Sequence, residues 1–176
     1  DMDLRIDGLK FQAIKSTSNG DLNLADVSVS KRVDLPRQTY GDVTIDNATF
    51  KQGLNLNSSG DITIRNSQFT KADSRLRSED GNIDLSNNRW RNLNISSTNG
   101  EINLEDQTVN KLLTADAENG DLTARIVPHA GTMIQASSSN GDASIYGKSH
   151  HNYGQPKTNG QTFQLSSSNG DVTVTR

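Results

Sequence analysis

A glycine-centred turn recurs about every twenty residues along this chain, and a short alternating pattern follows each copy. The tripeptide Asn-Gly-Asp stands at 19–21, 119–121, 140–142 and 169–171, with looser copies between them. The turn glycines are Gly20, Gly41, Gly60, Gly81, Gly100, Gly120, Gly141 and Gly170. A period of this length is typical of repeat architectures, in which each unit contacts only its neighbours. We therefore expect a long, regular surface and no obvious reaction centre.

The residues after each glycine alternate between apolar and polar. Val43-Thr44-Ile45 and Ile102-Asn103-Leu104 are examples, and this period of two predicts strands with one buried face. A second apolar pattern, such as Leu93 with Ile95, leads into the next glycine. Only 31% of the chain is hydrophobic. A solenoid tolerates that share because each coil needs few inward residues.

Two more positions keep one residue type from repeat to repeat. Six residues after the glycine stand Asp26, Asn47, Asn66, Asn87 and Asp106, a column that predicts a corner because such side chains tolerate unusual dihedral angles. Nine residues after the glycine the chain favours large apolar residues. We expect Phe11, Phe50, Phe69 and Trp90 to stack as a structural core column.

Two architectures fit these signals. The first is an all-β fold in which residues 1–176 form a single β-solenoid, or β-helix, of eight to nine coils, with an inserted loop at about 147–160. The alternative is an antiparallel meander whose Asn-Gly pairs make hairpin turns. The columns favour the solenoid, because stacking equivalent coils places like residues on like, whereas a meander pairs unlike strands.

Composition argues against several partners. The net charge is −3 without a run of like charges, so we expect no binding to nucleic acid. The chain has no cysteine, which excludes disulfides and cysteine-based zinc sites. No apolar run approaches the ~20 residues of a membrane helix. Both ends read as repeat strands, so we expect a chain processed or trimmed from a longer protein.

The run Ser-x-Asn-Gly-Asp, followed by alternating apolar residues, is clearest at 18–24, 139–145 and 168–174. It resembles the bacterial adhesin repeat family of cell-envelope proteins. The resemblance implies a β-solenoid at the bacterial cell envelope or surface, outside the cytoplasm. It implies a role in adhesion or envelope sensing and supplies no catalytic residues.

A carboxylate follows most turn glycines, as at Asp21, Asp61 and Asp171. Calcium prefers six to eight oxygen ligands, and one carboxylate per coil is a poor cage for it. We therefore expect these side chains to accept hydrogen bonds within the turn. We predict no metal site and no cofactor.

One interval departs from the period, because Gly141 and Gly170 are 29 residues apart. The extra segment carries Lys148, His150, His151 and Tyr153, whose side chains suit polar or sugar contacts. Loops in solenoids often carry function, so we predict a recognition loop here. A metal site is disfavoured because the two adjacent histidines do not share a strand face and lack a nearby carboxylate or cysteine.

The sequence holds no nucleophile elbow, phosphate loop or zinc-protease motif, so we predict no enzyme activity. The favoured function is a non-enzymatic extracytoplasmic module for adhesion or cell-envelope sensing, which presents a repetitive polar β-surface to a cell-wall or host-surface polymer or protein. One alternative is a structural or regulatory module that stacks on a partner domain or, end to end, on another copy. A glycan-active enzyme is the least favoured function.

Overall fold

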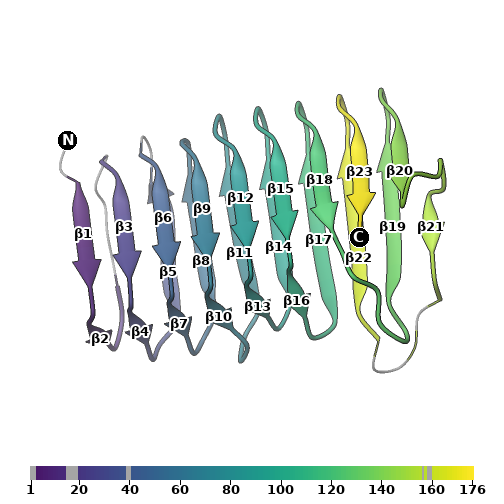
Figure 1. Cartoon of the computed structure of the whole chain (residues 1–176). Helices are drawn as coiled ribbons and strands as arrows, with labels where there is room; N and C mark the ends of the chain where they lie inside the picture. The colour runs from purple at the N-terminus through teal and green to yellow at the C-terminus, as the bar shows by residue number, and fades with distance from the viewer. Residues whose placement is uncertain (1–2, 15–19, 39–40, 156, 158–159) are drawn as a thin grey trace.

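The computed structural model describes residues 3–14, 20–38, 41–155, 157 and 160–176. Within these ranges the chain is all-β, with three sheets and no helix. Successive strands step from one sheet to the next, and the coils they form stack in a row (Figure 1). The prediction of a β-solenoid is confirmed.

The first sheet contains the strands that follow the turn glycines. In spatial order it holds β1 (Leu4–Asp7), β3 (Leu22–Ala25), β6 (Val43–Asp46), β9 (Ile62–Arg65), β12 (Ile83–Ser86), β15 (Ile102–Glu105), β18 (Leu122–Arg125), β23 (Val172–Thr175) and β20 (Ala143–Ile145). Their apolar residues point inward, as Ile62 and Ile64 do on either side of the half-buried Thr63. The alternation of the sequence thus becomes the inner and outer face of this sheet.

The other two sheets complete the coil. The second holds β2 (Lys10–Phe11), β4 (Ser28–Val29), β7 (Thr49–Phe50), β10 (Gln68–Phe69), β13 (Arg89–Trp90) and β16 (Thr108–Val109). The third holds β5 (Val33–Gln38), β8 (Leu54–Ser58), β11 (Ser74–Ser78), β14 (Leu93–Ser97), β17 (Leu112–Ala117), β22 (Thr162–Ser167), β19 (Met133–Ser138) and β21 (Asn152–Tyr153). The buried apolar residues of all three sheets form one continuous core.

Strand pairing decides between the two predicted architectures. Equivalent strands of neighbouring coils pair in parallel, so that Ile83 lies beside both Ile62 and Ile102. A meander would pair its strands antiparallel, and this alternative is therefore wrong. Among the described strands, the antiparallel pair is β19 with β21, at the end of the stack.

The column six residues after the glycine forms the corner between the first and second sheets. Asp26, Asn47, Asn66, Asn87 and Asp106 all have positive φ, between 48° and 54°. Short polar side chains tolerate this left-handed conformation better than others do, which accounts for the residue type. Gly8, with φ 64°, occupies the same corner in the first coil.

The predicted count of eight to nine coils is too high. Within the described residues, six coils have a strand in the second sheet. The strands β18, β20 and β23 follow turn glycines but continue into no such strand. At the corner position they carry Ile126, Gly147 and Arg176, whereas five of the six complete coils have aspartate or asparagine there.

The aromatic column lies on the inner side of the second sheet. Phe50, Phe69 and Trp90 are fully buried, and their rings stack with centroids 5.0 Å and 4.0 Å apart. Phe11 sits in the same column, half-buried against the core on the first coil. The indole Nε1 of Trp90 donates a 2.8 Å hydrogen bond to Oε1 of Gln107, so burial leaves no polar atom of this side chain unpaired.

At the C-terminal end the order of the strands in the sheets differs from their order in the chain. In the first sheet β23 lies between β18 and β20, and in the third sheet β22 lies between β17 and β19. Figure 1 shows the yellow C-terminal strands between green ones. The chain therefore skips one coil position after β18, builds β19 and β20, and returns to fill the gap. This return path accounts for the 29-residue interval between Gly141 and Gly170.

The serine, asparagine and glycine of the Ser-x-Asn-Gly motif each contact the neighbouring coil. The serine hydroxyl donates to the carbonyl of a turn glycine, as Ser167 does to Gly120 at 2.9 Å. The asparagine amides form a ladder, in which Nδ2 of Asn119 donates to Oδ1 of Asn99 at 3.1 Å. The ladder continues in spatial order through Asn169 to Asn140, with both hydrogen bonds at 2.9 Å.

The turn glycines are needed for close backbone stacking. A Cβ on Gly100 would lie 2.2 Å from the carbonyl oxygen of Gly81, and one on Gly81 would meet Gly60 equally closely. Neither residue has a positive φ. Glycine therefore stands here because a side chain has no room, and the turn geometry itself would accept other residues.

Candidate functional site

The last coil ends in a hairpin turn in place of the usual corner. Tyr146 and Gly147 have φ values of 54° and 72°, and the backbones of Ile145 and Lys148 exchange hydrogen bonds of 2.9 Å and 3.2 Å. Positive φ at both central residues is the requirement of the mirror-image hairpin turn. For an aromatic residue this conformation costs about 1–2 kcal/mol, and such strain often gathers at functional sites.

The reversed chain closes the end of the third sheet. In β21, Tyr153 pairs with Ile134, and Asn152 pairs with Gln135, both antiparallel. The amide of Ala136 also donates a 3.0 Å hydrogen bond to the carbonyl of His151. This segment therefore caps the sheet edge, which would otherwise expose unpaired backbone groups.

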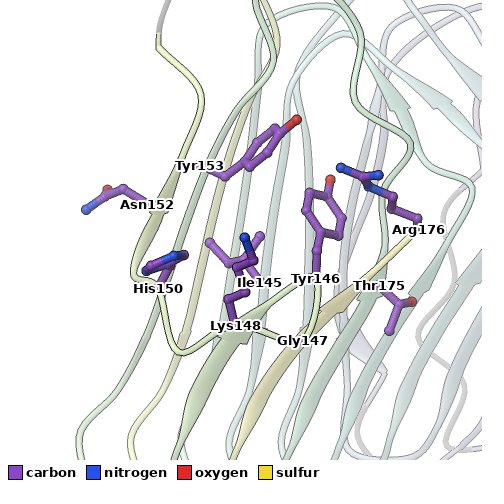
Figure 2. Close-up of a pocket in the computed structure, with 9 residues that line it drawn as sticks. All are labelled: Ile145, Tyr146, Gly147, Lys148, His150, Asn152, Tyr153, Thr175 and Arg176. Atoms are coloured by element: carbon purple, nitrogen blue, oxygen red, sulfur yellow. The ribbon is translucent and has the colours of Figure 1, made fainter.

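A cleft of about 610 Å³ opens between the hairpin, β21 and the end of β23. Its side chains include Tyr146, Lys148, His150, Asn152, Tyr153 and Arg176. Figure 2 shows the two tyrosines and Arg176 together, with Lys148 and His150 beside them. The cleft thus combines residues of the interrupted repeat with the last residues of the chain. We call it the terminal cleft.

Two tyrosines and an arginine form one side of the terminal cleft. The rings of Tyr146 and Tyr153 meet edge to face, with centroids 5.0 Å apart and planes at 88°. The guanidinium carbon of Arg176 lies 4.7 Å from the Tyr146 ring centroid, within cation–π range. The Tyr146 hydroxyl donates a 2.9 Å hydrogen bond to the carbonyl of Ile126. This contact and the ring pair hold the aromatic side in place.

Burial raises the pKa of the Tyr146 hydroxyl, the neighbouring Tyr153 adds to the shift, and Arg176 opposes it. Desolvation acts in this direction because it disfavours the phenolate. The hydroxyl therefore stays protonated at neutral pH and remains a hydrogen-bond donor. A pKa that moves away from neutrality also makes Tyr146 a poor general base.

The terminal cleft is positively charged although the chain is negative overall. Lys148 and Arg176 line it, and none of its lining residues is acidic. In the part of the chain that the structure describes, neither cation has a carboxylate within salt-bridge distance. By contrast, Arg125 contacts both Glu105 and Asp106. The two cations of the cleft are thus available to a ligand.

The four residues predicted as a recognition loop do not form one site. Lys148, His150 and Tyr153 line the terminal cleft. His151 lies just before β21, where its Nδ1 is 3.2 Å from the carbonyl oxygen of Ala136. There it borders a shallower groove of about 340 Å³ along β19 and β22. Its backbone carbonyl also accepts from the amide of Ala136, which holds this residue against β19 and away from the terminal cleft.

The carboxylate column is a hydrogen-bond ladder between neighbouring coils, so the prediction that these side chains bond within their own turn is wrong. Oδ1 of Asp42 accepts from the backbone amide of Asp61 at 2.9 Å, and Oδ1 of Asp61 accepts from that of Asn82 at 2.7 Å. Asn82 takes the same role toward Glu101, at 2.9 Å. Among the described residues, no cluster of three histidine or acidic side chains could hold a metal ion. The ladder accounts for the aspartates without any ligand.

Comparison with known protein families assigns the chain to a family. The sequence profile of the family described as Toastrack DUF4097 matches residues 12–175. The chain belongs to this family. Neither the curated proteins nor the solved structures contain a match. The Toastrack description contains no reference to adhesion, so the resemblance to adhesins is not confirmed beyond the repetitive β-solenoid. No helix able to span a bilayer occurs among the described residues of this Toastrack domain.

Sequence reasoning missed half of the terminal cleft of this Toastrack domain. Tyr146 was visible in principle, because a tyrosine followed by glycine replaces the usual corner residue. No feature of the sequence indicated that Arg176 would line the cleft. It reaches the terminal cleft because β23 lies beside β20, and nothing local in the sequence indicates that arrangement.

The carboxylate ladder of the Toastrack coil gives a direct test. We expect Asp61→Ala to lower the free energy of unfolding by roughly 0.5–1.5 kcal/mol, because the amide of Asn82 loses its acceptor. Asp61→Asn should stay close to wild type, since Asn82 itself performs this role. Urea unfolding followed by circular dichroism measures both. Equal losses for the two variants would contradict the ladder.

Proposed function

We propose that this Toastrack domain is a non-enzymatic, extracytoplasmic binding module for adhesion or cell-envelope sensing. Its ligand would be a cell-wall or host-surface polymer or protein, held first in the terminal cleft. The observation that carries the proposal is the cleft itself, which unites aromatic, basic and amide side chains where the repeat is broken. Convergent polar groups beside apolar surface are typical of binding sites.

The regular coils are better suited to a binding role than to catalysis. Their outer faces carry polar side chains that repeat from coil to coil, such as Thr44 beside Thr63 on the first sheet. In the terminal cleft the hydroxyl of Tyr146 is engaged by Ile126, and its pKa is shifted upward. An enzyme would instead need a poised acid–base pair. The solenoid acts as a rigid support that displays the cleft at one end.

Point variants test the proposal better than loop deletion. Residues 152 and 153 form β21 and cap β19, so removing the loop would damage the fold. Lys148 and His150 are exposed, and their side chains make no hydrogen bond or ion pair with the residues that the structure describes. The double variant Lys148→Ala/His150→Ala therefore alters the cleft with little effect on the core. Lys51→Ala/His129→Ala makes the same changes at exposed positions outside it.

We expect the wild-type chain to bind saturably to cell-wall preparations or to one member of a panel of glycans and matrix proteins. The cleft variant should bind at least about tenfold more weakly, a loss of about 1.4 kcal/mol, while the control matches wild type. Surface plasmon resonance gives the affinities. Equal binding by all three proteins would exclude the terminal cleft as the site. Turnover of any glycan would overturn the non-enzymatic assignment.

A second candidate is a structural or regulatory module that stacks on a partner domain or another copy. The observation in its favour is the apolar surface of the first coil, where Leu9 is 52% exposed and Phe11 is half-buried. In the described sheets β1 and β2 each pair on one side. Sedimentation velocity separates the self-stacking form of this candidate, which requires association that increases with concentration. The binding module requires none.

A further inference from the structure

We infer that the terminal cleft recognises an anionic polysaccharide segment, with a sugar ring against Tyr153 and a carboxylate or phosphate held by Arg176 and Lys148. This inference rests on the proposed binding function and adds the chemical class of the ligand. The charge of the cleft is the first argument. A chain of net charge −3 places two cationic side chains and no acidic side chain around one cleft. Such a cleft favours a negative group on the ligand.

The position of Arg176 is the second argument. Its guanidinium lies over the Tyr146 ring, and no described carboxylate pairs with it. A guanidinium placed over an aromatic ring still carries N–H donors. These donors match carboxylate and phosphate oxygens in a bidentate way. Arg176 can therefore donate hydrogen bonds to an oxyanion in the cleft.

The aromatic pair is the third argument. The Tyr146 hydroxyl is already bonded to Ile126 and Arg176 lies over its ring, so this residue anchors the cleft and leaves Tyr153 as the ring for a sugar. Tyr153 supplies the ring surface, and His150 and Asn152 add polar groups on the side of the cleft away from Tyr146 (Figure 2). A sugar ring combines apolar C–H faces with hydroxyls around its rim, which suits this mixture. The volume of about 610 Å³ falls within the range of small-molecule sites.

The surface next to the cleft extends the site to a polymer. Asn152 lines both the terminal cleft and the shallower groove on the third sheet. In that groove Gln135 contacts Asn152 at 3.3 Å and Gln164 at 3.2 Å, so uncharged amides continue the path. Ser137 and Ser166 add hydroxyls. A chain longer than one sugar can cross β21 from the charged cleft to this neutral polar groove.

Isothermal titration calorimetry with matched sugars tests the inference. The probes are tetragalacturonate and its neutral methyl ester, phosphorylated maltotetraose and maltotetraose, and an eight-residue oligothymidylate. We expect at least one acidic sugar to bind tenfold or more tightly than its neutral partner. The better of the two acids identifies carboxylate or phosphate as the preferred group. Arg176→Gln should remove this preference, while Lys51→Gln, with an equal change of charge, should keep it.

Several results would overturn the inference. Equal affinity for acidic and neutral sugars would leave the binding function intact and reject recognition of charge. Binding to cell-wall preparations without binding to any of the four sugars would also leave the binding function intact, and it would reject an anionic sugar as the ligand. Tighter binding of the oligothymidylate than of every sugar would identify a different polymer. Retention of the acid preference by a folded Arg176→Gln variant, with an unchanged thermal melt, would exclude Arg176 as the oxyanion contact.

Discussion

Replacing Trp90 by alanine is expected to lower the free energy of unfolding by about 3–5 kcal/mol, the cost of deleting a large buried side chain. Trp90 is fully buried, and its ring stacks on Phe69 with the planes 7° apart. The substitution would leave a cavity between coils and remove the hydrogen bond to Gln107. Neighbouring coils cannot close the gap easily, because their backbones are fixed by the sheet ladders.

Urea unfolding, followed by tyrosine fluorescence and circular dichroism, measures this loss. The control is Trp90→Phe, which keeps the stack and loses the hydrogen bond and part of the ring area. It should cost about 1–2 kcal/mol. A loss below about 1 kcal/mol for Trp90→Ala would mean that the ring is not part of the core. Coincident transitions from the two probes would show that the stack unfolds as one unit.

The second large effect is expected for Gly100→Ala. A Cβ there would lie 2.2 Å from the carbonyl oxygen of Gly81 and 2.5 Å from its carbonyl carbon. Both atoms belong to the backbone, so no side-chain rotation can relieve the overlap. The two coils must move apart, which weakens the ladders on either side of the turn. We expect a loss of about 3 kcal/mol, at the upper end of the range for overpacking.

Glu101→Ala is the matched control, because it introduces the same residue at the exposed neighbouring position. It should change stability by less than about 0.5 kcal/mol. Both variants are compared by thermal and urea unfolding of the full chain. If Gly100→Ala were as stable as Glu101→Ala, close backbone stacking would not be the reason for glycine at this position.

The features that repeat are the ones that sequence reasoning can predict. Each coil offers nearly the same environment at the same position, so a column of like residues reports one structural role several times. The corner is an example, because asparagine or aspartate recurs where φ is positive. The coil number could have come from the same column. Counting the aspartates and asparagines of this column gives five of the six observed coils, and Gly8 takes their place in the first, whereas counting turn glycines gives too many.

The features that occur once were harder to predict. Residues 168–174 match the repeat as well as any other copy, so nothing in them indicates a place between earlier strands. The terminal cleft depends on that place, because Arg176 comes from the inserted strand. Lys148, His150 and Tyr153 were found by the interrupted spacing alone. The separation of His151 from them depends on the pairing of β21 with β19, which the spacing does not define.

The displaced order of the last strands has a consequence for biosynthesis. Coils up to β18 can pair as they leave the ribosome, each on the one before it. The strands β19 and β20 cannot, because among the described strands their parallel neighbours are β22 and β23. A chain released before residue 161 would keep a regular stack but leave its penultimate segment unattached. The terminal cleft can therefore form only after β22 and β23 have been synthesised.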